Sequence, residues 1–101
     1  MERLAKFRSE IKTGDLVTVL STQKYFPLCR NNGKWFVPTS SKSHRIKKGE
    51  ALIVVVDEET LVHADDKHID DEDALTIHGV IVFASGSACF FGLPRESLCR
   101  Y

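Results

Sequence analysis

This sequence of 101 residues lacks the features that mark several large classes of protein. Its longest apolar run, Ala51–Val56, is far shorter than the roughly 20 residues that a membrane helix needs. No charged and then apolar leader stands at the start, so no signal peptide is expected. These absences predict a cytoplasmic protein that has no membrane partner.

Cysteine is also scarce, and its three copies are widely spaced, at Cys29, Cys89 and Cys99. A disulfide framework favours an even number of cysteines, and a structural zinc site favours closely paired ligands. Neither pattern is present in this sequence. We interpret the three residues as reduced thiols in the core or near the surface, and we expect no cofactor and no structural metal.

Catalytic motifs are missing as well. The chain contains no GxSxG, no P-loop, no HExxH and no dinucleotide fingerprint. Cys89 and His78 form a conceivable nucleophile pair, but His78 stands in a hydrophobic stretch, where a structural role is more common. The sequence therefore predicts a protein that is not an enzyme.

What the sequence does have is a strong division of charge behind a net charge of zero. Residues 1–50 carry eleven Lys and Arg against four Asp and Glu, whereas residues 51–101 carry three against ten. Such asymmetry is typical of a surface that faces a polyanion or an electrostatic partner. The alternative is that the two halves intermix in the fold and neutralise each other.

Short apolar stretches separated by turn residues predict a mainly β fold: a small β-barrel or a sandwich of five to seven short strands. The surest strand is Ala51–Val56, whose unbroken apolar run suits burial on both faces. An Asn-Asn-Gly sequence at 31–33 predicts a hairpin, and Gly79 interrupts the strand Leu75–Ala84. The sequences "SGS" and "PRES" predict a second hairpin and a helical turn before a last strand.

The predicted organisation is an N-terminal helical arm at 1–12 and a single small β-barrel domain at 13–101. Leu4, Phe7 and Ile11 stand at helical spacing, which favours the arm. The polar, acidic stretch at 57–74 lacks a hydrophobic period and is predicted to be a loop within the domain.

The opening "KTGDLVTVL", the central apolar strands and the closing "LPRESLCRY" together resemble the SH3-like small-barrel architecture. The Gly-Asp start is also similar to KOW-type nucleic-acid modules, although the compact glycine spacing of those modules is absent. The resemblance implies a binding module for peptide, RNA or DNA, and an architecture alone does not choose among these ligands.

The segment "TSSKSHRIKKGE", residues 39–50, carries five basic residues, counting a histidine, and four hydroxyls. We predict a loop whose cations contact phosphates, and the alternative is a merely solvated loop. Lysine also precedes the aromatic pairs Trp35–Phe36 and Tyr25–Phe26, an arrangement that suits single-stranded nucleic acid. The candidate nucleic-acid-binding residues are Lys34, Trp35, Lys42, His44, Arg45, Lys47 and Lys48.

The acidic stretch is the second candidate site, and it comprises Asp65, Asp66, Asp70, Asp71, Glu72 and Asp73. It lacks the glycine and the ligand spacing of a calcium loop, so no metal site is predicted there. It is interpreted either as a solvated loop or as an acidic surface for a basic protein partner.

These observations support two hypotheses. The first is a non-enzymatic module that binds nucleic acid or a nucleoprotein assembly through a basic, aromatic-flanked surface. The alternative is a protein-interaction or inhibitor module, of the kind found in phages and mobile elements, that presents its acidic loop to a basic partner. The sequence leaves the oligomeric state open.

Overall fold

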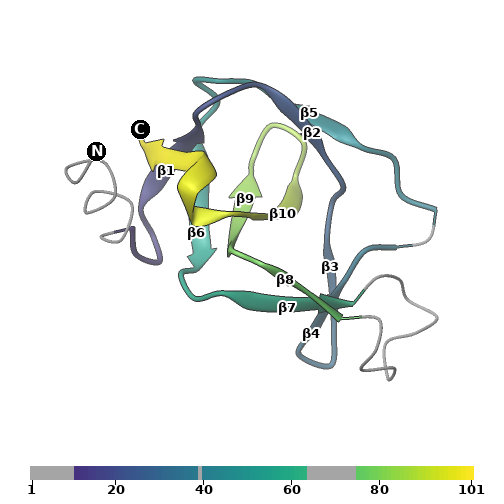
Figure 1. The fold of residues 1–101 in the computed structure, drawn as a ribbon. Helices are drawn as coiled ribbons and strands as arrows, with labels where there is room; N and C mark the ends of the chain where they lie inside the picture. Colours follow the sequence, from purple (N-terminus) through teal and green to yellow (C-terminus); the bar gives the residue numbers. More distant parts are fainter. Residues whose placement is uncertain (1–10, 39, 64–74) are drawn as a thin grey trace.

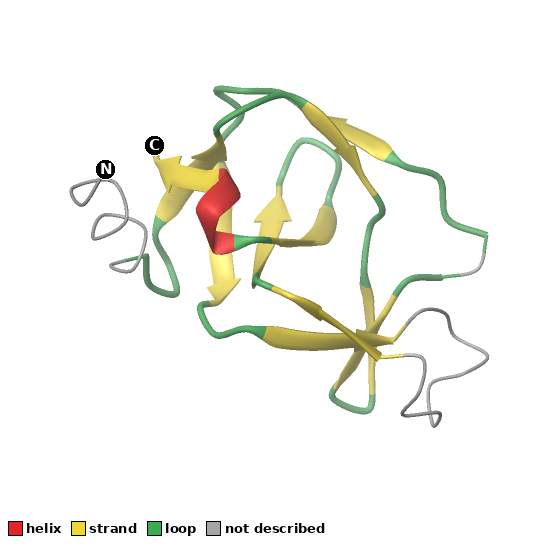
Figure 2. Ribbon diagram, in the orientation of Figure 1, coloured by secondary structure: helices red, strands yellow, loops and turns green. Residues whose placement is uncertain are grey.

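A computed structural model describes residues 11–38, 40–63 and 75–101 of the chain, and in these ranges the fold is mainly β (Figures 1 and 2). The described residues form eleven short strands and one 3₁₀ helix, Arg95–Ser97. The strands are β1 (Leu16–Val19), β2 (Gln23–Tyr25), β3 (Cys29–Asn31), β4 (Lys34–Phe36), β5 (His44–Ile46), β6 (Leu52–Val56), β7 (Thr60–His63), β8 (Leu75–His78), β9 (Val80–Ala84), β10 (Cys89–Leu93) and β11 (Leu98–Arg100).

The strands belong to three separate sheets. The largest has five strands in the order β10-β9-β6-β1-β11, all of them antiparallel to their neighbours. A second sheet is the two-stranded ribbon β2–β5, and the third has the order β3-β4-β7-β8. The pairing of β4 with β7 is parallel, whereas the other pairings of the third sheet are antiparallel.

Part of the five-stranded sheet lies between two apolar clusters, and β9 shows this most directly. Val80, Val82 and Ala84 belong to the larger cluster, which also contains Ile46 of the β2–β5 ribbon. Ile81 points to the opposite face and belongs to the second cluster, together with Leu28 and with Trp35 and Val62 of the third sheet. Because successive side chains of a strand point to opposite faces, β9 is buried on both sides.

Strand β6 was predicted to be buried on both faces, and this part of the prediction was wrong. Leu52 and Val54 are buried in the larger cluster, but Ile53 is 39% exposed on the other face. The second cluster covers only the far end of β6, at Val55 and Val56. An unbroken apolar run therefore marked a true strand whose outer face the third sheet covers only in part.

The predicted Asn-Asn-Gly hairpin is present, and it joins β3 to β4. Asn31 pairs with Lys34, which leaves Asn32 and Gly33 as the two turn residues. Their φ angles are 52° and 78°, the left-handed values that a two-residue hairpin turn of type I′ requires. Asn and Gly adopt this conformation at low cost, so the turn is encoded locally.

The predicted barrel was wrong, because the sheets of the described residues do not close into a barrel and contain eleven strands rather than five to seven. Closure requires unbroken hydrogen bonding around the sheet, whereas the β2–β5 ribbon pairs only within itself. Gly79 also divides the predicted strand 75–84, so that β8 and β9 enter different sheets.

The predicted helical arm at 1–12 is not seen, and no α-helix occurs in the described residues. Residues 1–10 lie outside the described ranges, and Ile11 and Lys12 are not helical. Ile11 is instead buried in the larger cluster, and the backbone then turns at Gly14, where φ is 94°. The division into an arm and one domain at 13–101 stays a prediction.

The acidic stretch 57–74 was predicted to be a loop, but Thr60–His63 forms β7, a strand inside the third sheet. Val62 is fully buried there, and its backbone neighbour on the parallel strand is Trp35. Residues 64–74 lie outside the described ranges. Within those ranges, no helix has the length and apolar content that crossing a membrane requires.

Asp57 joins the start of the described chain to the β6–β7 turn. Its Oδ2 accepts a hydrogen bond of 3.0 Å from the backbone N–H of Thr13, and Arg95 donates to its carbonyl oxygen and to that of Ile11. The bond from Thr13 lowers the pKa of the Asp57 carboxyl below its ordinary value of 3.8, partly opposed by desolvation. The charged form is thus favoured in the folded state.

We expect Asp57→Asn to lower stability at neutral pH but to matter less in acid. Because the pKa is lower in the folded state, the stabilisation is present above the unfolded pKa and is lost as the pH falls through the folded value. Urea unfolding of both proteins at about pH 6 and about pH 3 measures the difference. A gap in unfolding free energy that stays the same at both pH values would contradict this assignment.

Candidate functional site

The basic segment 39–50 is only partly a loop, because its centre forms β5 and pairs with β2. Gln23 lies opposite Ile46, Lys24 opposite Arg45, and Tyr25 opposite His44. Ile46 is 1% exposed and belongs to the larger apolar cluster, so the ribbon is attached to the core. The feature of the sequence that could have indicated this strand is Ile46, the single apolar residue within the basic segment.

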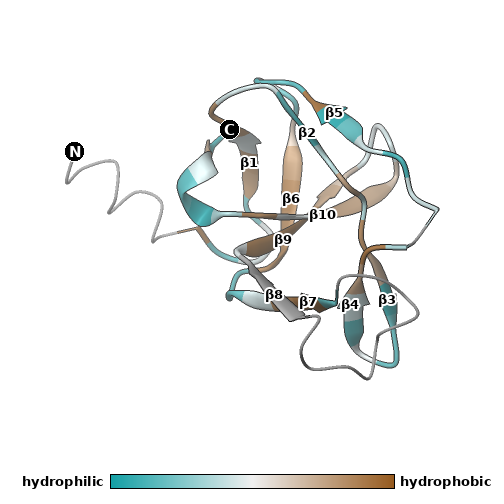
Figure 3. Ribbon diagram, turned by 45° about the vertical axis from the view of Figure 1, so that its right-hand side comes forward, coloured by the Kyte–Doolittle hydropathy of each residue, from teal (hydrophilic) through white to brown (hydrophobic). Residues whose placement is uncertain are grey.

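The outward face of the ribbon carries a concentration of positive charge. Lys24 and Arg45 are both exposed and are direct cross-strand partners, so their side chains leave the same face. Three more exposed cations flank them in the chain. We call this surface the basic ribbon, and it comprises Lys24, Lys42, Arg45, Lys47 and Lys48. Figure 3 shows β5 as largely hydrophilic, in contrast to β6 and β9.

The lysine turn that follows β5 is held in place by two threonine side chains. The N–H of Lys48 donates to Thr22 Oγ1 at 2.9 Å, and the N–H of Gly49 donates to Thr18 Oγ1 at 2.8 Å. Gly49 has a φ of 95°, which suits a residue without a Cβ atom. The backbone that presents Lys47 and Lys48 is therefore anchored to β1, through Thr18, and to the segment between β1 and β2, through Thr22.

The charges of the basic ribbon are not neutralised within the described part of the chain. Among the described residues, no ion pair joins its five cations to a carboxylate. By contrast, Arg100, which lies outside the basic ribbon, places its Nη2 3.5 Å from Asp15 Oδ2. Both strands of the ribbon come from residues 1–50, while each of the other two sheets contains strands from both halves. The charge asymmetry of the sequence thus survives folding at this one sheet.

His44, one of the predicted site residues, lies on the inward face of the ribbon. It is half-buried, and its ring meets that of Phe91 edge-on, with the centroids 6.0 Å apart. Its partner Tyr25 also packs against the core, and burial raises the pKa of the Tyr25 hydroxyl. The Tyr25 hydroxyl donates a hydrogen bond of 3.1 Å to Gln23 Oε1. His44 therefore helps to seat the ribbon on the core.

Lys34 and Trp35 lie on β4 in the third sheet, and the structure does not bring them to the ribbon (Figure 1). Trp35 is 8% exposed, and its ring contacts that of Phe90 at a centroid distance of 5.3 Å. The Arg30 guanidinium lies over the same indole at 5.6 Å. With its ring enclosed in this way, Trp35 has no open face on which a base can stack.

The exposed ring next to the ribbon is that of Phe26, which follows β2 directly. The residue is 55% exposed, an unusual value for phenylalanine. In the sequence, Lys24 precedes the pair Tyr25–Phe26, but the sequence does not indicate which of the two rings is exposed. The structure shows that Tyr25 packs on the core and that Phe26 does not.

The other predicted sites have no described counterpart. All six acidic candidates, Asp65, Asp66, Asp70, Asp71, Glu72 and Asp73, lie outside the described residues, as does the side chain of His78 that was considered with Cys89. Cys89 itself is half-buried, and its thiol donates to the carbonyl of Ser87 at 3.3 Å. In the ranges that the structure describes, no group of three or more His, Cys, Asp or Glu is arranged to hold a metal ion.

Comparisons with protein-family models, with curated proteins and with solved structures find no match to this chain. They therefore add no support to the resemblance to the SH3-like barrel architecture, and the mainly β structure is the part of that prediction that holds.

Proposed function

We propose that this protein is a non-enzymatic binding module for nucleic acid, alone or within a nucleoprotein assembly, and that the basic ribbon is its binding surface. The observation that carries the proposal is the cross-strand pair of Lys24 and Arg45. Like charges directly opposite each other destabilise a β-ladder, so such a pair is better accounted for by a ligand than by folding. The proposal retains the sequence-based expectations of no catalytic step, no cofactor and a cytoplasmic location.

Phosphate groups are suitable ligands for a surface where two cations pair across the β2–β5 ribbon and three more exposed cations flank them in the chain. Lysine and arginine bind phosphate oxygens and release counterions from the nucleic acid, which provides affinity with little dependence on base sequence. The threonine bonds to Lys48 and Gly49 fix the backbone of the turn before a ligand arrives. A fixed backbone reduces the ordering cost of binding.

Replacing Arg45, Lys47 and Lys48 together by alanine is expected to weaken binding to every oligonucleotide tested. Each lost phosphate contact removes about 0.7–0.9 from the slope of log K against log salt, so the slope should fall by about 2–3. Stability should change by less than about 0.5 kcal/mol for each exposed residue. Fluorescence anisotropy at several salt concentrations, together with a thermal melt, measures both effects.

The matched control removes three exposed cations from outside the basic ribbon: Lys12, Lys34 and Arg100. It changes the net charge equally, so a local binding surface predicts a much smaller loss of affinity. Equal losses in the two triple variants would show a general effect of net charge and would contradict the ribbon as the site. If the parent protein binds no nucleic acid at low salt, the alternative of a basic protein partner for the acidic segment takes first place.

A further inference from the structure

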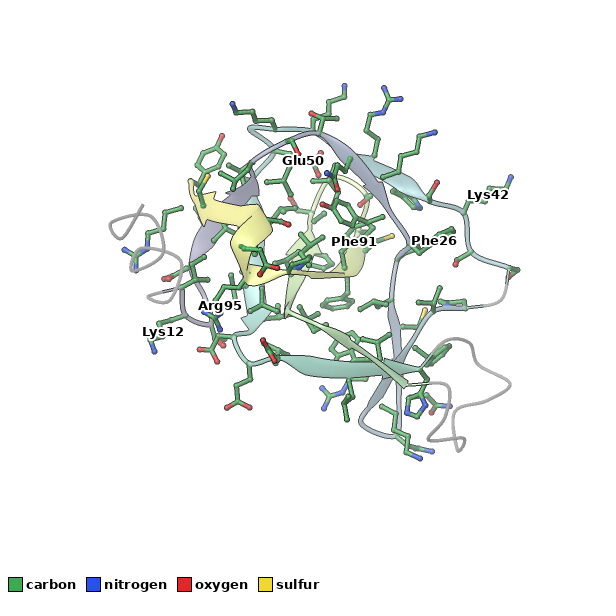
Figure 4. All side chains as sticks on the ribbon, viewed as in Figure 1. Lys12, Phe26, Lys42, Glu50, Phe91 and Arg95 are labelled. Atoms are coloured by element: carbon green, nitrogen blue, oxygen red, sulfur yellow. The ribbon has the colours of Figure 1, made fainter. Side chains whose placement is uncertain are left out.

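Phe26 stands out as an apolar ring held at a surface that otherwise carries cations. Its 55% exposure leaves much of the ring in water, although the neighbouring core buries other aromatic rings such as Phe91. Figure 4 shows Phe26 and Lys42 on the same side of the molecule. Phe26 follows the end of β2, and Lys42 precedes the start of β5. An exposed ring in such a position costs solvation free energy unless a ligand covers it.

The backbone on both sides of Phe26 is fixed. Tyr25 packs against the larger cluster, and Leu28 is buried, with its N–H donating to the carbonyl of Phe90 at 2.8 Å. Pro27 further restricts the preceding residue to extended conformations. Phe26 therefore cannot turn inward without displacing Tyr25 or Leu28, and its ring is presented to solvent by its neighbours.

Alternation along the extended chain places Phe26 with the cations. Tyr25 faces the core, so the residues before and after it, Lys24 and Phe26, point away from the core. The ring thus continues the row that begins with Lys24 and its partner Arg45. Tyr101 is also highly exposed, but it follows β11 at the edge of another sheet.

We propose that the ligand of the basic ribbon is a single-stranded nucleic acid, with its phosphates on the cations and one base stacked on Phe26. This inference rests on the proposed function. An aromatic ring beside a basic track is the arrangement by which proteins bind single strands, because every base has a face available for stacking. In a duplex the faces of the bases are already covered by their neighbours, so the Phe26 ring has nothing to stack on.

The test uses fluorescein-labelled DNA and RNA oligonucleotides in anisotropy titrations of the full chain. Three forms of one length are compared: a single strand, its duplex, and an abasic strand that keeps the phosphates and lacks the bases. We expect the parent protein to bind the single strand most tightly. Phe26→Ala should weaken that binding by about 5- to 150-fold, the range for loss of one stacked base. Its affinity for the abasic strand and the salt slope should stay as in the parent.

Two further variants separate stacking from other effects. Phe26→Trp should bind the single strand at least as well as the parent, because the larger ring also stacks. Tyr101→Ala removes an aromatic residue that is even more exposed than Phe26 but lies away from the basic ribbon, and it should leave binding unchanged. If Phe26→Ala does not fold, Phe26→Leu keeps an apolar side chain without the aromatic face, and the same loss is expected.

The outcomes distinguish this inference from the function on which it rests. If Phe26→Ala binds the single strand as tightly as the parent, while the triple variant of Arg45, Lys47 and Lys48 binds weakly, the stacking role is wrong and the proposed function stands. Tighter binding of the parent to duplex than to single strand also overturns the inference. If the parent binds none of the three oligonucleotides, both proposals fail.

Discussion

Val54→Asp is expected to destabilise the protein severely, because it places a carboxylate in the larger apolar cluster. Val54 is 1% exposed, and its N–H and carbonyl are bonded to the backbone of Asp15 and Gly14 at 3.0 and 2.7 Å. The strand therefore cannot rotate to bring the new side chain to water. A buried charge without a partner costs more than about 4 kcal/mol, a large share of the stability of a domain of this size.

The matched control is Ile53→Asp, one residue earlier on the same strand. Ile53 is 39% exposed on the opposite face, so its replacement keeps the carboxylate in contact with water. We expect a loss of about 1 kcal/mol, against a loss for Val54→Asp that lowers the melting temperature by about 15–30 °C. Similar melting temperatures for the two variants in circular dichroism would show that the two faces of β6 have been assigned wrongly.

The effect of Val54→Asp should also depend on pH in a defined direction. Burial raises the pKa of a carboxyl group in the folded state, so the neutral form is the one that folding tolerates. The variant should therefore be most stable in acid and should lose stability as the pH rises above about 4, the ordinary range of an aspartate. A destabilisation equally large at about pH 3 and about pH 7 would point to a loss of packing alone.

Gly79→Ala is expected to lower the stability of the fold strongly, although it adds only a methyl group. Gly79 lies between β8 and β9, where the chain passes from the third sheet to the five-stranded sheet. A Cβ atom at this position would lie 2.2 Å from the carbonyl oxygen of Leu93 and 2.8 Å from backbone atoms of Pro94 and Arg95. Backbone atoms cannot move aside as a side chain can, so we expect a loss of about 3 kcal/mol or more.

Gly86→Ala is the control for this substitution, because a Cβ atom there meets no atom within 4 Å and the φ angle is not left-handed. Its effect should stay within about 0.5 kcal/mol, as for most exposed positions. Urea unfolding of both variants measures the difference, with the slope m checked against that of the parent. If Gly79→Ala is as stable as Gly86→Ala, the close approach of the two backbone segments at Gly79 is wrong.

The features that could be predicted from the sequence are those that neighbouring residues encode among themselves. The Asn32–Gly33 turn is one, since both residues adopt left-handed φ angles in any context. The mainly β class is another, because β-branched residues recur between turn residues. For the candidate site, the charge asymmetry predicted a basic surface; in the structure Arg45 lies in β5, and Lys42, Lys47 and Lys48 flank that strand in the chain.

Other features depended on contacts between distant segments, which periodicity does not contain. The pattern of β6 did not show that its outer face is only partly covered at Ile53, because the third sheet that covers the rest comes from elsewhere in the chain. Strand β7 was missed for a similar reason: Thr60–His63 is stabilised by pairing with β4 and β8. Whether the sheets close into a barrel also depends on pairing between distant strands, and here the β2–β5 ribbon pairs only within itself.

The sequence by itself determined the chemistry of the candidate surface: cations, an aromatic ring and little to neutralise them nearby in the chain. Only the tertiary structure decided which of these groups share a face. Pairing of β2 with β5 places Lys24 opposite Arg45, turns His44 inward and leaves Phe26 exposed. Trp35 is buried because the third sheet packs on β9 and β10 of the five-stranded sheet. The physical reason is that side chains alternate along a strand, so pairing and burial determine which of them reach the solvent.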